Sequence, residues 1–328
     1  MKEVINDDLA RSIEYGYLAD SLSGTYNNKE IQIRANLGLG IAYYRLTTID
    51  SAEKYLTRAV ELSDEYGIHH RLPWIYGALG NTYLFLNKFD LAIKEFFNGI
   101  KVSNKYNLNN LISDYYNQIG LIELRTQNYN NALFSFNKAY EFQVLTDKPE
   151  FQIIKLNIAI CYIFLEKNKE AEEVIGEIYQ QYNNGDLNPR LRKTSSEGYY
   201  AEVNRQLGIL LMKKENLDSA KYHLFQSIKH INDFNRFKLQ GIYSILGEIY
   251  KKENKIDSSI LFFNKALKET NIYQDPFELT NIRKHLAELY YQLGDHERSN
   301  EYFNQALTLD DSLQRINQDE KIRASYMD

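Results

Sequence analysis

The sequence lacks long apolar runs and has very little cysteine. Its most apolar short run, LGILLM at 207–212, is flanked by Arg205, Lys213 and Lys214, and it is far shorter than the ~20 apolar residues that span a bilayer. The first residues, MKEVINDDLARS, have no apolar core of the kind that signal peptides carry. The single cysteine, Cys161, excludes an internal disulfide framework, and its apolar neighbours predict a buried, unreactive thiol.

The chain also lacks a block of basic residues. Its 39 lysines and arginines are balanced by 44 aspartates and glutamates, and the net charge is −5. Without a basic patch that could neutralise a run of phosphates, we expect no direct binding of nucleic acid by this segment. The 27 tyrosines and 16 phenylalanines instead predict a folded protein with many apolar interfaces.

Motifs of catalysis and of metal or cofactor binding are missing as well. Gly38-Leu-Gly40 resembles the start of a dinucleotide loop, but the third glycine is absent and the segment is predicted to be helical. The six histidines form no HExxH motif, and the adjacent pair His69 and His70 would diverge on a helix. No serine lies in a nucleophile elbow. We therefore expect a protein that is not an enzyme and that has neither a cofactor nor a metal.

What the sequence does contain is one pattern that returns about every 40 residues. A small residue is followed twelve positions later by a second small residue, and four positions after that by a large apolar one. The first small residues are Gly40, Gly80, Gly120, Ala159, Gly208, Gly247 and Ala287. The second are Ala52, Ala92, Ala132, Ala171, Ala220, Ser259 and Ser299, and the large ones are Leu56, Phe96, Phe136, Ile175, Leu224, Phe263 and Phe303. Intervals of three, four and seven place such side chains on one stripe of each of two helices.

This order resembles the tetratricopeptide repeat, in which Leu-Gly, Tyr, Ala, Phe and Ala follow one another through two antiparallel helices. The stretch ALGNTYLFLNKFDLAIKEFFNGI at 78–100 matches it closely. Departures occur at Glu123 and Leu211, where tyrosine is expected, and at Gly99, Ile178 and Ser227, where the second alanine is expected. The resemblance implies an all-α fold without β-sheet. It would be an α-α superhelix, a right-handed tetratricopeptide (TPR) solenoid of about seven helix pairs, with an extra helix at each end.

We expect three segments along the chain. Residues 1–30 are a partial repeat or a capping helix, because residues 5–22 look like a second helix without its first; we favour a fragment of a longer protein over a cap. Residues 31–309 are seven repeats in one solenoid, and residues 310–328 are a C-terminal helical extension. The repeat step of 49 residues includes the insertion at 183–193, which predicts an exposed loop. The prolines fit this arrangement, since they lie at or just before first helices or in that loop.

The C-terminal segment LTLDDSLQRINQDEKIRASYMD resembles the helical segment that follows the repeats in bacterial sensor proteins of the Bacteroidetes type. In those proteins the repeats precede a membrane helix and then a histidine kinase or helix-turn-helix output domain. The resemblance implies the sensory or scaffold segment of a bacterial signalling or regulatory protein. Such a segment is cytoplasmic as given, and periplasmic if it belongs to a membrane-anchored regulator.

The same resemblance implies where a ligand would bind, because the first helices of tetratricopeptide arrays line a concave groove. Transferring the groove positions to this chain gives the candidate peptide-binding residues Arg34, Tyr44, Arg45, Trp74, Asn81, Phe85, Asn117, Gln118, Arg125, Asn157, Phe164, Arg205 and Gln206. The amides among them can donate to and accept from an extended peptide backbone. Arg125 or Arg205 could hold a carboxylate by two parallel hydrogen bonds. For any single position, a polar side chain that merely lines a solvated groove is the alternative.

Three functions remain open at this point. The first is a non-enzymatic module that binds a protein or peptide segment. The second is a peptide-pheromone receptor similar to the Rap and PlcR type, and the third is an accessory repeat domain of an enzyme whose catalytic part is absent. The sequence leaves open the ligand, the output domain and the oligomeric state, a homodimer included.

Overall fold

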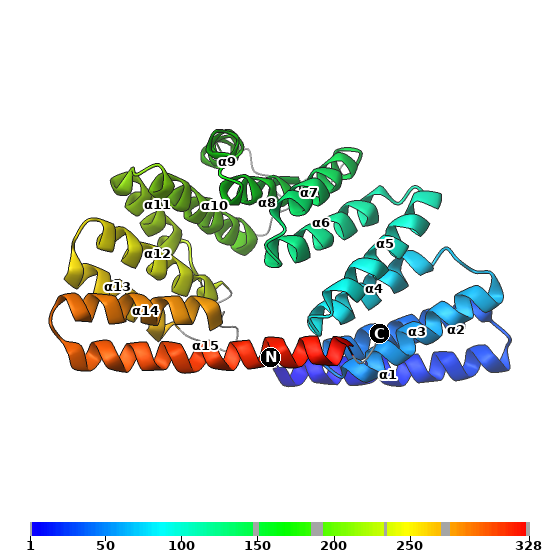
Figure 1. Cartoon of the computed structure of the whole chain (residues 1–328). Helices are drawn as coiled ribbons and strands as arrows, with labels where there is room; N and C mark the ends of the chain where they lie inside the picture. The colour runs from blue at the N-terminus through cyan, green and yellow to red at the C-terminus, as the bar shows by residue number, and fades with distance from the viewer. Residues whose placement is uncertain (1, 147–150, 185–192, 233–234, 270–275, 326–328) are drawn as a thin grey trace. The chain divides into compact units, whose positions relative to one another are not determined.

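The chain folds into helices throughout the part that the structure describes (Figure 1). This computed structural model describes residues 2–146, 151–184, 193–232, 235–269 and 276–325, with the side chains of these ranges except 2–7, 151, 193–196, 276–277 and 311–325. Fifteen α-helices, one 3₁₀ turn and no strand lie within those ranges. The helices of the first half are α1 (Lys2–Thr25), α2 (Lys29–Arg45), α3 (Ile49–Tyr66), α4 (Leu72–Phe85), α5 (Phe89–Lys105), α6 (Asn109–Arg125), α7 (Tyr129–Val144) and α8 (Phe151–Phe164). Those of the second half are α9 (Asn168–Asn183), α10 (Lys193–Lys213), α11 (Leu217–Lys229), η1 (Arg236–Lys238), α12 (Leu239–Lys252), α13 (Ile256–Lys268), α14 (Pro276–Gln292) and α15 (His296–Ser325).

The predicted helix pairs are confirmed. Helices α2, α4, α6, α8, α10, α12 and α14 are the first helices of seven repeats, and each is followed by its second helix. Pro73 lies in the first turn of α4 and Pro276 begins α14, as the sequence predicts. Most of the predicted loop at 183–193 lies outside the described residues, as do Pro149 and Pro189.

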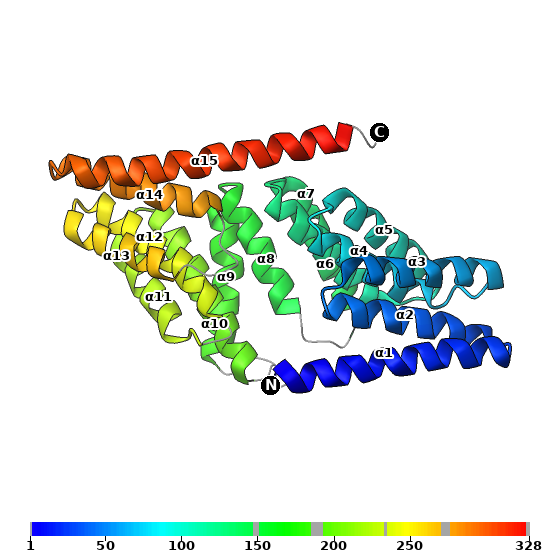
Figure 2. The same cartoon turned by 90° about the horizontal axis from the view of Figure 1, so that it is seen from below.

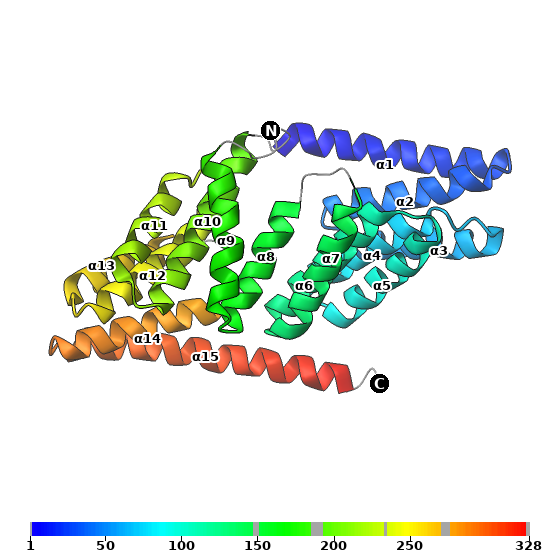
Figure 3. The ribbon, with the colours of Figure 1, turned by 90° about the horizontal axis from the view of Figure 1, so that it is seen from above.

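The chain divides into two units, Met1–Lys167 and Asn168–Asp328. Within the first unit, α4 and α6 lie in one layer and α5 and α7 in the other (Figure 1). Helix α1 lies along α2 (Figure 2), and Gly16 of α1 faces Leu39. Within the second unit, α14 and α15 lie side by side (Figure 3), and α15 continues without a break from the last repeat beyond residue 310. A single solenoid over 31–309, with separate end segments, stays a prediction.

Five of the seven repeats are held by a large side chain of the second helix packed against a glycine of the first, as the sequence pattern predicts. A methyl group on Gly80 would lie 2.6 Å from the Phe96 ring, and one on Gly120 would lie 2.7 Å from Phe136. The corresponding pairs are Gly40 with Leu56, Gly208 with Leu224 and Gly247 with Phe263. Even one methyl group at these glycines would push the helices apart, so the small residues set the helix spacing.

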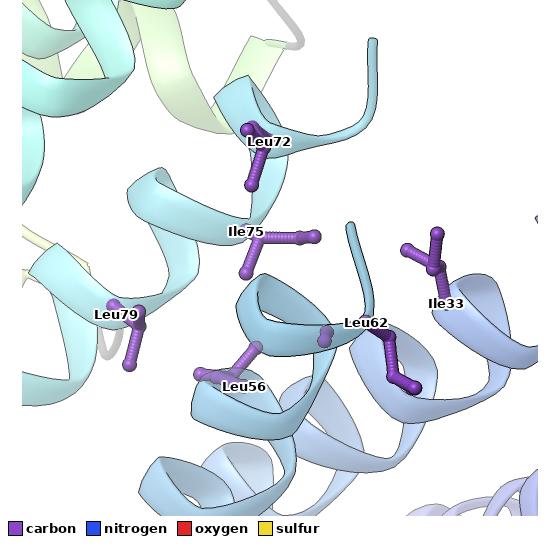
Figure 4. Packing of buried hydrophobic residues seen from close by; sticks show 7 residues of the cluster. Ile33, Leu56, Leu62, Leu72, Ile75 and Leu79 are labelled. Atoms are coloured by element: carbon purple, nitrogen blue, oxygen red, sulfur yellow. The ribbon is translucent and has the colours of Figure 1, made fainter. Parts of the chain in front are cut away.

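Neighbouring repeats share their cores, as expected for helix pairs that cannot bury their own apolar stripes. Figure 4 shows such a cluster, in which Leu56 and Leu62 of α3 pack with Ile33 of α2 and with Ile75 of α4. All four side chains are fully buried. Cys161 is also buried, in the cluster around Phe136, and burial raises the pKa of its thiol to about 12, which confirms the predicted buried thiol.

The turn inside each repeat is closed by one residue in the left-handed backbone conformation. Its φ lies between 57° and 75° in all seven repeats. These residues are Thr47, Asn87, Gln127, Glu166, Glu215, Asn254 and Gly294. Because the turn has the same geometry each time, the interval from the first small residue to the second stays at twelve positions.

Among the positions that depart from the repeat pattern, Glu123 places an ionisable group in the core. Glu123 stands where tyrosine is expected, and it is half-buried, with the Ser135 hydroxyl donating to its carboxylate at 2.6 Å. Burial raises the pKa of Glu123 above its ordinary value, even though the hydrogen bond from Ser135 opposes the shift. The ionised carboxylate is therefore less stable in the folded chain than in water.

We expect Gly80→Leu to destabilise the fold by about 2–4 kcal/mol, because the new side chain collides with Phe96. In a repeat array the damage should be greatest in adjacent repeats, so hydrogen exchange should show the largest loss of protection within residues 60–130. Gly38→Leu is the matched control, since nothing lies within 4 Å of a methyl group at Gly38. Equal destabilisation by both variants, or a uniform loss of protection, would contradict the packing described above.

Glu123→Gln should raise the melting temperature near neutral pH. Glutamine keeps an acceptor for Ser135 and removes the buried charge. Because the folded-state pKa of Glu123 is raised, the native chain binds the proton more tightly, and the advantage of the variant should disappear as pH falls below about 4. The exposed Glu65→Gln serves as control. A pH-independent difference between Glu123→Gln and the parent chain would argue against this explanation.

Candidate functional site

Six of the thirteen candidate residues line one hollow in the first unit. Its volume is about 460 Å³, and its walls come from α2, α4, α5 and α6. We call it the first hollow. The predicted residues that line it are Tyr44, Arg45, Trp74, Asn81, Asn117 and Gln118. Trp74 is 39% exposed, so its indole ring offers an apolar surface to a ligand next to the polar side chains of the hollow.

The base of the first hollow is a fixed aromatic residue. Tyr115 is 6% exposed, stacks on Phe96 with ring centroids 5.8 Å apart, and donates from its hydroxyl to the backbone carbonyl of Pro73 at 2.7 Å. Gly77 leaves room for the ring, because a methyl group there would lie 2.7 Å from the Tyr115 hydroxyl. Burial raises the pKa of Tyr115, so the phenol stays neutral and keeps donating. The hollow therefore has a rigid floor.

The amides that line the first hollow fall into two kinds, one paired with a residue outside it and two without a protein partner among the described residues. Asn157 of α8 donates to the side-chain oxygen of Asn117 at 3.1 Å and is only 9% exposed, so these two side chains hold each other. Asn81 and Gln118 are half-buried, and neither side chain makes a hydrogen bond within the described part of the chain. Their donors and acceptors face no competition from protein groups.

A second hollow of about 370 Å³ lies beside the first, between α1 and α2. We call it the second hollow. Ile41 and Arg45 line both hollows, while Arg34 lines only the second. Two predicted residues, Arg34 and Arg45, therefore line the second hollow from the same helix, α2.

Four predicted residues of the first unit lie outside both hollows, and the Asn157 described above is one of them. Phe85 packs edge-to-face with Tyr44 at 6.1 Å and is 53% exposed. Phe164 stacks on Tyr129 with centroids 4.7 Å apart, and Arg125 lies over the Phe89 ring at 5.2 Å. Direct contact of these residues with a ligand stays a prediction.

The last two predicted residues belong to the second unit and already have a charged partner. Arg205 donates to the Glu202 carboxylate at 2.6 and 3.1 Å, and Gln206 donates to the same oxygen at 2.8 Å and is 3% exposed. Lys238 donates to the other oxygen at 2.7 Å. Burial opposes ionisation, yet the charges of Arg205 and Lys238 hold the pKa of Glu202 well below its usual range. A ligand carboxylate at Arg205 would have to displace Glu202.

The structure adds residues that the sequence analysis did not select. Asp114 and Tyr115 line the first hollow, and Gly38 lines the second. Asp114 lies three and four positions before Asn117 and Gln118, so helical spacing alone could have found it. Gly38 lies outside the repeating position that Gly40 occupies, and this was the signal in the sequence that could have found it.

Within the described residues, no group of three histidine, cysteine, aspartate or glutamate side chains is placed to hold a metal ion. In that same part of the chain, no helix has the length and apolar character that a membrane crossing requires.

Comparison with known proteins identifies the repeats. One model of the tetratricopeptide repeat matches residues 32–96, and a second matches residues 113–143, 241–271 and 285–312. A search of curated proteins finds no match.

Several solved structures are similar in fold. A tetratricopeptide repeat protein from Parabacteroides merdae has 14% identity and a TM-score of 0.61, with 84% of this chain and 93% of that chain covered. The apo form of RapI has 12% identity and a TM-score of 0.65, with 87% and 99% covered. The apo form of the quorum sensor NprR from B. thuringiensis has 18% identity and a TM-score of 0.65, with 92% and 87% covered. At these identities the likeness concerns the fold.

Repeat pattern, helix order, glycine contacts and matching models therefore agree that the chain carries tetratricopeptide repeats, which the family models match at residues 32–96, 113–143, 241–271 and 285–312.

Proposed function

We propose that this chain is a non-enzymatic binding module that holds an extended peptide, or an extended segment of a protein, in the first hollow. The observation that carries the proposal is the convergence of Asn81, Gln118 and Trp74 on one hollow. The two amides have no protein partner within the described residues, and the tryptophan is partly exposed. This combination suits a ligand with both a polar backbone and apolar side chains.

The amides favour a peptide over a small apolar ligand. An extended backbone presents a donor and an acceptor at each residue, and an Asn or Gln side chain can satisfy both at once. Trp74 and the rigid Tyr115 floor offer aromatic surface to a side chain of the ligand. Asn117 and Asn157 support the wall through their mutual hydrogen bond.

The finer role that we propose is the sensory or scaffold segment of a bacterial signalling or regulatory protein. Tetratricopeptide folds generally serve as binding scaffolds, and the resemblance of the C-terminal segment to bacterial sensor proteins supports this role. The likeness in fold to the quorum sensor NprR supports a second candidate, a receptor for a short peptide signal. The two differ in ligand length, so a free peptide of about ten residues that binds as tightly as a longer segment would favour the second.

Replacing both Asn81 and Gln118 by alanine should weaken peptide binding by about 1–3 kcal/mol, since each hydrogen bond contributes about 0.5–1.5 kcal/mol. The probe is a fluorescein-labelled peptide selected from a random twelve-residue display library on the whole chain, and the measurement is its dissociation constant by fluorescence anisotropy. The control is the pair Asn104→Ala and Asn131→Ala, two exposed asparagines of α5 and α7. An unchanged dissociation constant in the Asn81 and Gln118 double variant would remove the first hollow as the binding site.

A further inference from the structure

Gly38 is a glycine in a helix interior that no neighbouring side chain explains. Glycine destabilises a helix relative to alanine. A glycine inside a helix is therefore usually explained by a neighbouring group that leaves no room for a side chain. In the repeat pairs that group is a large side chain, as with Gly40 against Leu56. Nothing lies within 4 Å of a methyl group at Gly38, which is exposed on the wall of the second hollow. The backbone of α2 is therefore accessible to an approaching group.

The second hollow is also positively charged. Among the residues with described side chains, Arg34 and Arg45 are the charged ones that line it, and none of the lining residues is a carboxylate. Among the residues that the structure describes, neither arginine has an ion-pair partner, whereas Arg58 pairs with Glu61 and Arg71 pairs with Glu30. An unpaired guanidinium beside a hollow offers fixed donors that match a carboxylate.

The spacing along α2 places these features on one stripe. Residues 34, 38, 41 and 45 are separated by four, three and four positions, which is the repeat of a single helix face. The two arginines are about 16 Å apart along the axis, a distance that an extended peptide covers in about five residues. Because Ile41 and Arg45 also line the first hollow, a chain lying there continues directly into the second.

We infer that the second hollow is a subsite for acidic residues of the bound peptide. The main chain of the peptide passes close to Gly38, and two acidic side chains, three to five positions apart, meet Arg34 and Arg45. This inference rests on the proposed function and adds the direction and charge of the ligand. The acidic part lies over α2, away from Asp114, which lines the first hollow from α6.

The first test uses the random twelve-residue display library on the whole chain and on Arg34→Gln. On the parent chain we expect enrichment of Asp or Glu at two positions separated by three to five residues. On Arg34→Gln one of the two preferences should disappear, and a peptide selected on the parent should bind about tenfold more weakly. Arg58→Gln on α3 is the matched control, because it removes the same charge from a paired arginine. Peptides without acidic preferences, or with the same preferences on Arg34→Gln, would overturn the inference.

The second test is Gly38→Leu, which places an apolar side chain in the subsite at a position where an added methyl group has no neighbour within 4 Å. Binding of the selected peptide should fall at least about tenfold while the melting temperature stays the same or rises. Gly176→Leu is the control, since Gly176 in the interior of α9 is equally open and lies in the other unit. Undiminished binding to Gly38→Leu would overturn the inference.

The experiments give different results when only the acidic subsite is wrong and when the proposed function is wrong as well. Peptides whose binding depends on Asn81 and Gln118, but not on Arg34 or Gly38, overturn the acidic subsite and leave the first hollow as the binding site. Peptides indifferent to all four residues, or no enriched peptide at all, overturn both.

Discussion

The close approach of two helices at a glycine is the contact on which the rest of the structure depends. Where Gly80 meets Phe96 or Gly120 meets Phe136, even one added methyl group would collide with the ring. The same contact recurs in five of the seven repeats, so their paired helices approach one another in the same way. Side chains about 40 positions apart in the sequence, such as Asn117 and Asn157, are thereby brought within hydrogen-bonding distance.

Most of the fold could be predicted because this contact requires small and large residues at regular intervals in the sequence. The small and large residues of each pair fixed the seven helix pairs and placed Pro73 at the start of α4. The left-handed turn positions could not be predicted from residue type, since Thr47, Gln127 and Glu215 occupy them as well as Gly294. Glu123 also could not be interpreted from the sequence, because its half-buried position and its bond to Ser135 depend on tertiary packing.

The candidate site was predicted less completely. Among the positions chosen on the first helices, Trp74 and Asn81 line the first hollow, and their part in ligand binding stays a prediction. For two other predicted residues, Arg205 and Gln206, the hydrogen-bond partners could not be foreseen. Gln206 is buried against Glu202, and Arg205 forms an ion pair with the same carboxylate. Arg205 is already paired with Glu202, whereas Arg34 and Arg45 have no ion-pair partner in the part of the chain that the structure describes and remain available to a ligand.

The central claim is that a peptide occupies the first hollow, and Trp74 allows a direct measurement. It is the single tryptophan of the sequence and is 39% exposed. It lines that hollow and also a neighbouring hollow beside Asn109 and Thr146, so its fluorescence reports on a ligand that covers the indole from either one. When a peptide selected on the whole chain is titrated in, the emission of Trp74 should shift to shorter wavelength and saturate at the dissociation constant found by anisotropy, because the ligand excludes water from the indole. Binding by anisotropy with no change in Trp74 emission would place the ligand elsewhere and contradict the account.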